Sequence, residues 1–489
     1  MQSLTCDTMP DLTNLFYPKS IAIIGVSNNP IKGASAFLYA LRSVDFPNPV
    51  YSVSKTRDKV IFDENAYPTI LDVPGKIDYA IIGVPAKDVP QVVNECGQKG
   101  VKFITIFSSG FSELGTEEGR LLEEKFLQNT KGARIVGPNC LGVYCQESRV
   151  TITEILNVPE REGEVSYISQ SGGHTGSFYL FGTDRGFGFN KVVSIGNQCD
   201  LTIQDFIEYY AQDEKTKVIS CYLESIKESP NFFKILQNTT PKKPVIFWKG
   251  GQTQEGSLAA SSHTGAISSS YTLFKAAIHQ SGGIIANSLE ELADLTLGAL
   301  FLSDKQLGKQ IGILVPGGGS CVEMTDEAIR NDLRVPEFSK ETKEKIQAQI
   351  QEVNTSTRNP ADLGVFGWLP IIYSRVLLHV AEDPNIDTII FYFMTERLPS
   401  MIDRMNQRSL GKQFLKNIKN VQRKSDKPFI CLLPNIMVAD QEITRLRTEF
   451  INGLIDLKIP HFPSMERAAN VISKLIKYKN FTIKHEKNG

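Results

Sequence analysis

The 489-residue sequence lacks the marks of several protein classes. Its 53 basic and 54 acidic residues give a formal net charge of −1. A chain so close to neutral builds no field that gathers nucleic acid or an anionic membrane surface. No uninterrupted apolar run approaches the ~20 residues that a membrane-spanning helix needs. We therefore expect neither nucleic acid nor a membrane among its partners.

Cysteine is present but not organised for metal binding or cross-linking. The eight cysteines are scattered, with no Cys-x-x-Cys pair and no Cys/His cluster. This spacing disfavours a zinc site and a disulfide framework, and it is typical of a reducing compartment. Residues 1–14 are polar and contain no apolar core of a signal peptide. We expect a cytoplasmic protein that holds no metal of its own.

Two familiar nucleotide motifs are also missing. The Walker A pattern G-x-x-x-x-G-K-[ST] does not occur, and the first glycine-rich turn, residues 25–33, is not a clean G-x-G-x-x-G. No acidic residue for a ribose stands at the expected distance after that turn, which disfavours a nicotinamide dinucleotide site. The chain is expected to hold phosphates without an ATP site of its own.

What the sequence does contain is one local pattern repeated three times. Short apolar runs at residues 20–25, 164–169 and 310–315 each end in a Gly- or Ser-rich turn and continue into a helical pattern. Such runs are typical of buried parallel strands. The length also favours about three domains. We predict an α/β fold of three doubly wound domains, with boundaries at 1–148, 149–302 and 303–489.

Each turn stands where a helix is expected to begin. Free backbone N–H groups and the helix dipole make such a position suitable for an anion. A bare glycine-rich turn is as often only a tight connection between elements, so each turn by itself leaves both interpretations open.

Two of the six histidines lie in small-residue turns. His174 belongs to Ser-Gly-Gly-His-Thr-Gly and His263 to Ser-Ser-His-Thr-Gly-Ala. Phosphoryl transfer to histidine needs a neutral ring nitrogen, room for the phosphate, and donors for its oxygens, and either turn offers these. Spacing alone does not separate the two. The other histidines indicate only packing or surface roles.

Motifs in a fixed order along nearly the whole chain give a more specific indication. They are FSSGFSE (107–113), GPNCLG (137–142), ISQSG (168–172), SIGNQCD (194–200), YLES (222–225), SHTGA (262–266), PGGGS (316–320) and NPADL (359–363). With these motifs the chain resembles the ADP-forming acetyl-CoA (acyl-CoA) synthetases, relatives of succinyl-CoA synthetase. The resemblance implies a Rossmann-like CoA-binding domain followed by two flavodoxin-like domains of the succinyl-CoA synthetase type.

The resemblance also implies roles for single positions. His263 matches the phosphorylated histidine, and Glu224 matches the carboxylate that holds and orients it. Two helix N-termini are implied to cradle the phosphoryl group, at Ser169, Gln170, Ser171, Gly172 and Gly173, and at Gly317, Gly318, Gly319 and Ser320. The positions implied to contact CoA are Gly25, Ser27, Lys55, Val84, Ser108, Ser109, Pro138 and Asn139.

The implied activity is that of the alpha subunit of an NDP-forming acyl-CoA synthetase. Such an enzyme interconverts acyl-CoA, ADP and phosphate with a carboxylic acid, ATP and CoA, through acyl phosphate and phosphohistidine intermediates. No ATP-grasp domain is recognised in this sequence, although longer relatives carry one. The resemblance therefore implies a separate ATP-grasp beta subunit in an α2β2 heterotetramer, with Mg²⁺ bound beside ATP or ADP on that partner.

Departures from the family pattern keep other interpretations open. Ser54 stands where many relatives have Asn, and Gly173-His174 replaces a small apolar residue, so His174 is a second candidate for the phosphate site. One alternative function is a CoA-binding regulator or scaffold without ligase activity. Another is acyl transfer between CoA thioesters through a glutamyl or cysteinyl intermediate, for which Cys140 is the candidate thiol. The sequence does not indicate the acyl group.

Overall fold

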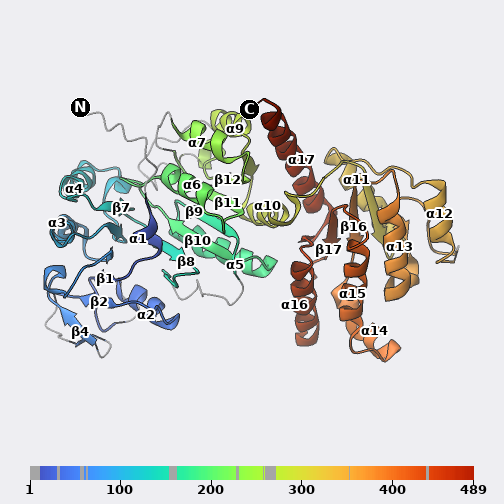
Figure 1. Cartoon of the computed structure of the whole chain (residues 1–489), viewed down its shortest axis with the longest axis horizontal. Helices are drawn as coiled ribbons and strands as arrows, with labels where there is room; N and C mark the ends of the chain where they lie inside the picture. Colours follow the sequence, from blue (N-terminus) through green and yellow to red (C-terminus); the bar gives the residue numbers. More distant parts are fainter. Residues whose placement is uncertain are drawn as a thin grey trace. The chain divides into compact units, whose positions relative to one another are not determined.

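The computed structural model contains three sheets with helices between their strands (Figure 1). The chain divides into two compact units, residues 1–292 and 293–489. No helix in the described part of the chain is both long and apolar enough to cross a bilayer. His263 lies outside the residues that the structure describes, which are 11–29, 33–55, 60–61, 64–152, 162–226, 231–256, 258, 271–351, 353–436 and 440–488.

The first sheet has the doubly wound order expected for a Rossmann-like domain. Its strand order is β3-β4-β2-β1-β5-β6-β7, and only the β3–β4 pair is antiparallel. Without β3, the order along the chain is 3-2-1-4-5-6, in which the winding reverses between β1 and β5. The strands are β1 (Ile21–Ile24), β2 (Val50–Val53), β3 (Val60–Ile61), β4 (Glu64–Tyr67), β5 (Tyr79–Ile82), β6 (Phe103–Ile106) and β7 (Arg134–Val136). The helices are α1 (Thr13–Phe16), α2 (Ser35–Ser43), α3 (Val89–Lys99) and α4 (Glu117–Leu127), with 3-10 turns η1 (Ile70–Asp72), η2 (Ala86–Asp88) and η3 (Ser112–Leu114).

The second sheet has a flavodoxin-like order with one added edge strand. The order is β13-β12-β11-β9-β10-β8, and β8 pairs antiparallel to β10. Residues 142–145 of the predicted first domain thus supply an edge strand of this sheet. The strands are β8 (Gly142–Cys145), β9 (Val165–Ser169), β10 (Phe189–Ser194), β11 (Val218–Leu223), β12 (Val245–Lys249) and β13 (Ile284–Ala286). The described helices are α5 (Gly172–Arg185), α6 (Ile203–Gln212), α7 (Asn231–Thr239) and α9 (Tyr271–Gln280).

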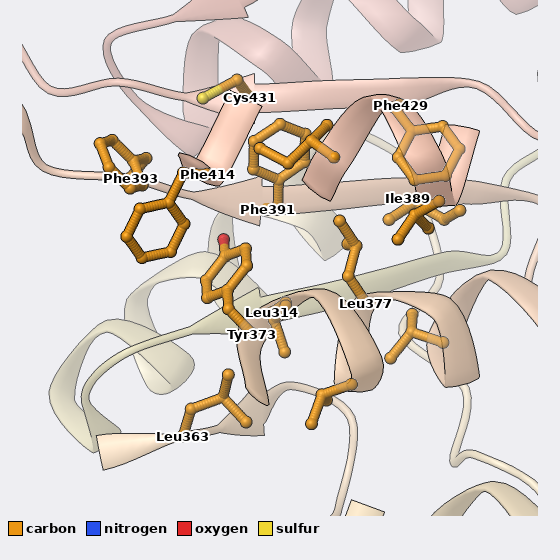
Figure 2. Packing of buried hydrophobic residues seen from close by; sticks show 14 of the residues in the cluster. Leu314, Leu363, Tyr373, Leu377, Ile389, Phe391, Phe393, Phe414, Phe429 and Cys431 are labelled. Carbon is orange, nitrogen blue, oxygen red and sulfur yellow. The ribbon is translucent and has the colours of Figure 1, made fainter. Parts of the chain in front are cut away.

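The third sheet repeats the flavodoxin-like order, as β15-β14-β16-β17-β18, in the second unit. Figure 2 shows Tyr373 and Leu377 pointing from α13 toward Ile389 and Phe391 of β16 in its core. The strands are β14 (Ile311–Val315), β15 (Ala361–Asp362), β16 (Thr388–Tyr392), β17 (Phe429–Leu432) and β18 (His461–Phe462). The helices and 3-10 turns are α10 (Leu289–Leu302), α11 (Gly318–Arg330), α12 (Lys340–Gln347), η4 (Gly364–Trp368), α13 (Pro370–Glu382), η5 (Thr395–Arg397), α14 (Leu398–Met405), α15 (Leu410–Gln422), α16 (Gln441–Asp456) and α17 (Met465–Asn488). The α/β class and the expected domain types are therefore confirmed.

A buried ion pair supports the second sheet. Lys191 of β10 is 1% exposed, and its ammonium donates to Asp213 Oδ2 at 2.7 Å. The same oxygen accepts from Asn190 Nδ2 at 2.6 Å and from Thr216 Oγ1 at 2.8 Å. Burial alone raises the pKa of Asp213, but the bonds with Lys191, Thr216 and Asn190 outweigh it and hold the pKa below its usual range.

We predict that Asp213→Ala strongly destabilises the protein. The substitution leaves the Lys191 ammonium buried without its carboxylate, which costs about 3 kcal/mol or more. Because the folded-state pKa of Asp213 is depressed, its contribution is present above the unfolded pKa and is lost as pH falls through the folded pKa. Urea unfolding at neutral pH should show the loss, and the gap from wild type should narrow in acid. Glu117→Ala, which removes an exposed helix-surface carboxylate, is the control, and equal midpoints for both variants would contradict the prediction.

Candidate functional site

A cavity of about 570 Å³ opens at the carboxyl ends of β1, β2 and β5. This is the topological switch point of the first sheet, where ligands bind in open α/β folds. Four of the residues predicted to contact CoA line it, namely Gly25, Ser27, Lys55 and Val84. The remaining lining residues are Ile24, Val26, Gly33, Val53, Ser54, Pro68, Thr69, Gly83, Pro85, Asp88, Val92 and Glu95.

The cavity owes its shape to the turn that follows β1. Gly25 has φ +98°, and a Cβ atom there would stand 2.5 Å from the Gly83 carbonyl oxygen. The Ser27 N–H donates to Ser35 Oγ at 2.9 Å, and that hydroxyl donates back to the Ser27 carbonyl at 2.9 Å. Ser54 Oγ donates to the Val26 carbonyl at 2.8 Å. Ser54, which stands where many relatives have Asn, therefore helps to fix the same turn.

The lining combines apolar side chains with three charged residues, which are Lys55, Asp88 and Glu95. Ile24, Val26, Val53 and Val92 present apolar walls, while Lys55 is the basic residue among the lining residues. Its side chain is exposed and can meet a phosphate at the cavity mouth.

The other four positions predicted to contact CoA are not lining residues of the cavity. The Ser108 hydroxyl donates to the carbonyl of Val84, and the Ser108 carbonyl accepts from the Asn139 N–H at 3.0 Å. Pro138 is buried, and its carbonyl accepts from the Asn197 N–H at 3.0 Å; Ser109 is exposed. Residues 137–141 therefore connect the cavity wall to the loop after β10 of the second sheet.

The Ser169–Gly173 turn lies at the switch point of the second sheet, between β9 and β11. Ser171 is the N-cap of α5, and its hydroxyl accepts from the His174 N–H at 3.4 Å. Ser169 Oγ donates to the Ser171 carbonyl at 2.7 Å and so fixes the turn. The first N–H groups of a helix have no partner within it, and here they belong to Gly172 and Gly173. This arrangement is suited to a phosphoryl group.

Glu224 follows β11 at the same edge of the sheet, and three residues hold it. The Gln170 side-chain oxygen accepts from the N–H groups of Glu224 at 2.9 Å and Ser225 at 3.0 Å. The Tyr222 hydroxyl donates to Glu224 Oε1 at 3.2 Å, and Lys249 Nζ donates to the Glu224 carbonyl at 3.2 Å. Burial lowers the pKa of Lys249, and the charge of Glu224 opposes that shift. The Gln170 side chain thus supports Glu224, and the Gln170 N–H donates to the Tyr222 carbonyl at 3.0 Å, so both are engaged by the strand beside β9.

Gln170, Tyr222 and Lys249 were not predicted as supports of Glu224. Tyr222 offers a weak signal, because side chains two residues apart in a strand point to the same face. The bonds of Gln170 and Lys249 depend on which strands are neighbours, which the local sequence does not state.

His174 lies in the first turn of α5 and packs against aromatic rings. Its ring centroid is 4.4 Å from that of Tyr222 and 4.8 Å from that of Trp248. Burial lowers the pKa of His174, and the charge of Glu224 partly offsets this. The ring is therefore neutral near pH 7.

The Gly317–Ser320 turn opens α11 at the end of β14. Gly317 is the N-cap, and Gly318, Gly319 and Ser320 form the first turn. A Cβ atom on Gly318 would stand 3.2 Å from Asp362 Oδ2. A carboxylate is thus already close to this helix N-terminus. The role of the Gly317–Ser320 turn in phosphate binding stays a prediction.

Cys140 is packed rather than reactive. It is 3% exposed, and its thiol donates to the Val136 carbonyl at 3.4 Å. Burial raises the pKa of Cys140 to about 12, so the thiolate is scarce at neutral pH. This geometry argues against a cysteinyl intermediate at this position.

The described residues contain no group of three or more His, Cys, Asp or Glu side chains that could hold a metal ion.

Comparison with known proteins identifies the two domains that contain these candidate sites. The family model "CoA binding domain" matches residues 19–146, and "Succinyl-CoA ligase like flavodoxin domain" matches residues 162–298. The chain is 32% identical over 486 residues to the alpha subunit of acetate–CoA ligase [ADP-forming] I of Pyrococcus furiosus, covering 97% of this chain and 99% of that one. It is 32% identical over 483 residues to acetate–CoA ligase [ADP-forming] II of Archaeoglobus fulgidus, covering 96% of this chain and 67% of that longer one.

A solved structure has a similar fold over nearly the whole chain. The dinucleotide-forming acetyl-coenzyme A synthetase 1 of Ca. Korarchaeum cryptofilum, in complex with phosphate and ADP, aligns with a TM-score of 0.82 and 28% identity. The alignment covers 98% of this chain and 99% of that chain. Fold and matched domains define a CoA-binding protein of the succinyl-CoA ligase type. Within that class, the chain belongs to the ADP-forming acetate–CoA ligase family.

Proposed function

We propose that this chain is the alpha subunit of an ADP-forming acid–CoA ligase, which binds CoA and carries a phosphoryl group on His263. The observation that carries the proposal is that a cavity and a helix N-terminus, both suited to anions, lie at the switch points of two sheets. The cavity with Gly25 and Lys55 lies at one, and the α5 N-terminus beside Glu224 lies at the other. A near full-length match to a named alpha subunit supports it.

The proposed reaction has three transfers. A phosphate oxygen attacks the acyl-CoA carbonyl, the C–S bond breaks, and CoA leaves as acyl phosphate forms. A neutral nitrogen of His263 then attacks phosphorus, and the carboxylic acid leaves as its carboxylate. An ADP oxygen finally takes the phosphoryl group and frees the histidine. Covalent catalysis lets each transfer occur where its own partner is bound.

The described residues of this chain position and neutralise charge during those steps. The Gly172 and Gly173 N–H groups can hold phosphoryl oxygens, and Glu224 can accept the ring N–H of the phosphorylated histidine. Because Gln170 fixes the backbone of Glu224, its position is set before substrate arrives. Gly317–Ser320 is the proposed second cradle for the phosphohistidine.

The nucleotide step needs a partner. We propose an ATP-grasp beta subunit in an α2β2 assembly in the cytoplasm, with Mg²⁺ held there with ATP or ADP. Mg²⁺ would supply neutralisation of nucleotide phosphate charge on that subunit. The acyl group is open, and a panel of carboxylic acids assayed with the reconstituted complex would identify it.

Labelling and titration together test the proposal. With the beta subunit, Mg²⁺ and γ-labelled ATP, this chain is expected to take up label that is labile in acid and stable in base. Calorimetric titration of the chain with CoA is expected to show binding. CoA binding without label would favour a CoA-binding regulator or scaffold instead. Absence of both CoA binding and label would contradict both functions.

A further inference from the structure

Three aromatic rings meet at the edge of the second sheet that carries Glu224. The aromatic triad consists of His174 in α5, Tyr222 in β11 and Trp248 in β12. Its centroids lie 4.4 Å (His174–Tyr222), 4.8 Å (His174–Trp248) and 4.6 Å (Tyr222–Trp248) apart. Tyr222 and Trp248 are direct register partners on neighbouring parallel strands, so their rings project from one face. The first turn of α5 then places His174 against both.

The triad fixes the direction of a single hydroxyl group. Tyr222 is 6% exposed and donates to Glu224 Oε1 at 3.2 Å. A Cβ atom on Gly250 would stand 2.9 Å from that hydroxyl oxygen, so residue 250 leaves room for the hydroxyl only as glycine. Burial, together with the charge of Glu224, raises the pKa of Tyr222, which keeps the hydroxyl protonated and able to donate.

We propose that the triad positions Glu224, by holding the Tyr222 hydroxyl on its carboxylate so that the carboxylate keeps one orientation. This inference rests on the proposed function of Glu224. In this role, the His174 ring packs against the Tyr222 ring. It is neither a second phosphate acceptor nor a phosphate ligand.

The geometry favours this role over phosphate binding. The rings of Tyr222 and Trp248 both pack against the His174 ring, at interplanar angles of 56° and 72°. The lowered pKa of His174 leaves it uncharged near neutral pH, so it brings no positive charge to a bound anion, while the packing of its ring argues against an acceptor role. A neutral ring in van der Waals contact with two others is what an aromatic packing role requires.

The test follows single-turnover phosphorylation of the chain by labelled acetyl phosphate, which requires no nucleotide-binding partner. Tyr222→Phe keeps the ring and removes only the hydroxyl. At saturating acetyl phosphate its rate is expected to fall on the order of tenfold to a hundredfold, the effect of losing a hydrogen bond to a charged group. The half-saturating concentration and the affinity for CoA should stay near wild type, which a general loss of structure would not allow.

His174 variants distinguish ring packing from nitrogen chemistry. His174→Phe keeps an aromatic ring, so its rate is expected to stay within about threefold of wild type, whereas His174→Ala should be slowed like Tyr222→Phe. If His174→Phe is as slow as His174→Ala, a ring nitrogen is required and the packing role is wrong. If Tyr222→Phe reacts at the wild-type rate, Glu224 does not need the hydroxyl and the proposal is also overturned.

The same assay separates this inference from the function on which it rests. A wild-type chain that takes no label from either acetyl phosphate or ATP contradicts the proposed function, and the inference falls with it. A wild-type chain that is labelled while Tyr222→Phe matches its rate contradicts the inference alone.

Discussion

Replacing His263 by alanine is expected to abolish the acid-labile label completely. The variant lacks the nucleophile, and loss of a catalytic nucleophile lowers rates by roughly 10⁴-fold to 10⁶-fold. Although His263 lies outside the described residues, the segment leading to it leaves the sheet beside Glu224. The Gly250 N–H donates to the Leu223 carbonyl at 2.7 Å, directly before Glu224. The chain from β12 therefore starts at the same edge as the α5 turn.

The measurement is the stoichiometry of base-stable label per chain after reaction with γ-labelled ATP and the beta subunit. His279→Ala in α9 provides a matched control, since the sequence indicates no catalytic role for that histidine, and it should be labelled fully. Label that persists in His263→Ala but disappears in His174→Ala would identify His174 as the acceptor. That result would also overturn the packing role of the aromatic triad.

Local pattern was sufficient to predict the strands that open each sheet. The apolar runs at residues 20–25, 164–169 and 310–315 are β1, β9 and β14, each followed by a turn and a helix as expected. Buried parallel strands need continuous apolar residues, so they can be recognised in a sequence. The pairing of β8 with β10 was not foreseen, because pairing between distant segments is set by tertiary packing.

The candidate site was predictable in its backbone and less so in its side chains. Gly25, Ser27, Lys55 and Val84 line one cavity because turns after parallel strands meet at the same edge, and their contact with CoA stays a prediction. Their assignment to CoA came from the motif order, since composition and spacing contain no information about the ligand. The Gln170 side chain, by contrast, turns to Glu224 and not to a ligand, because β9 and β11 are neighbours.

The order of the strands also explains why the two histidines could not be separated by spacing. Both lie in sequence segments rich in small residues, and only the fold shows the rings of Tyr222 and Trp248 beside His174. A neutral, packed imidazole and an accessible one have the same local sequence signature. The environment of His174 depends on the register of β11 with β12. This register brings Tyr222 beside Trp248, although the two residues are 26 positions apart in the sequence.

Gly25→Ala is expected to weaken CoA binding by at least about 100-fold, or about 2.7 kcal/mol. The new Cβ atom would stand 2.5 Å from the Gly83 carbonyl oxygen and 2.9 Å from its carbon. Both contacts are with backbone, so the ends of β1 and β5 must separate where they form the cavity floor. The φ of +98° adds strain that an alanine does not tolerate easily. Calorimetric titration with CoA measures the loss.

Gly75→Ala separates backbone strain from steric closure of the cavity. Gly75 also has a positive φ, +76°, but a Cβ atom there meets nothing within 4 Å. The affinity of the Gly75→Ala variant for CoA should therefore match that of the wild type. Labelling by acetyl phosphate, which uses the second sheet and no CoA, should persist in Gly25→Ala if that region remains folded. Retained label with lost CoA binding would place the two halves of the chemistry on two separate sheets, and wild-type affinity in Gly25→Ala would show that CoA binds elsewhere.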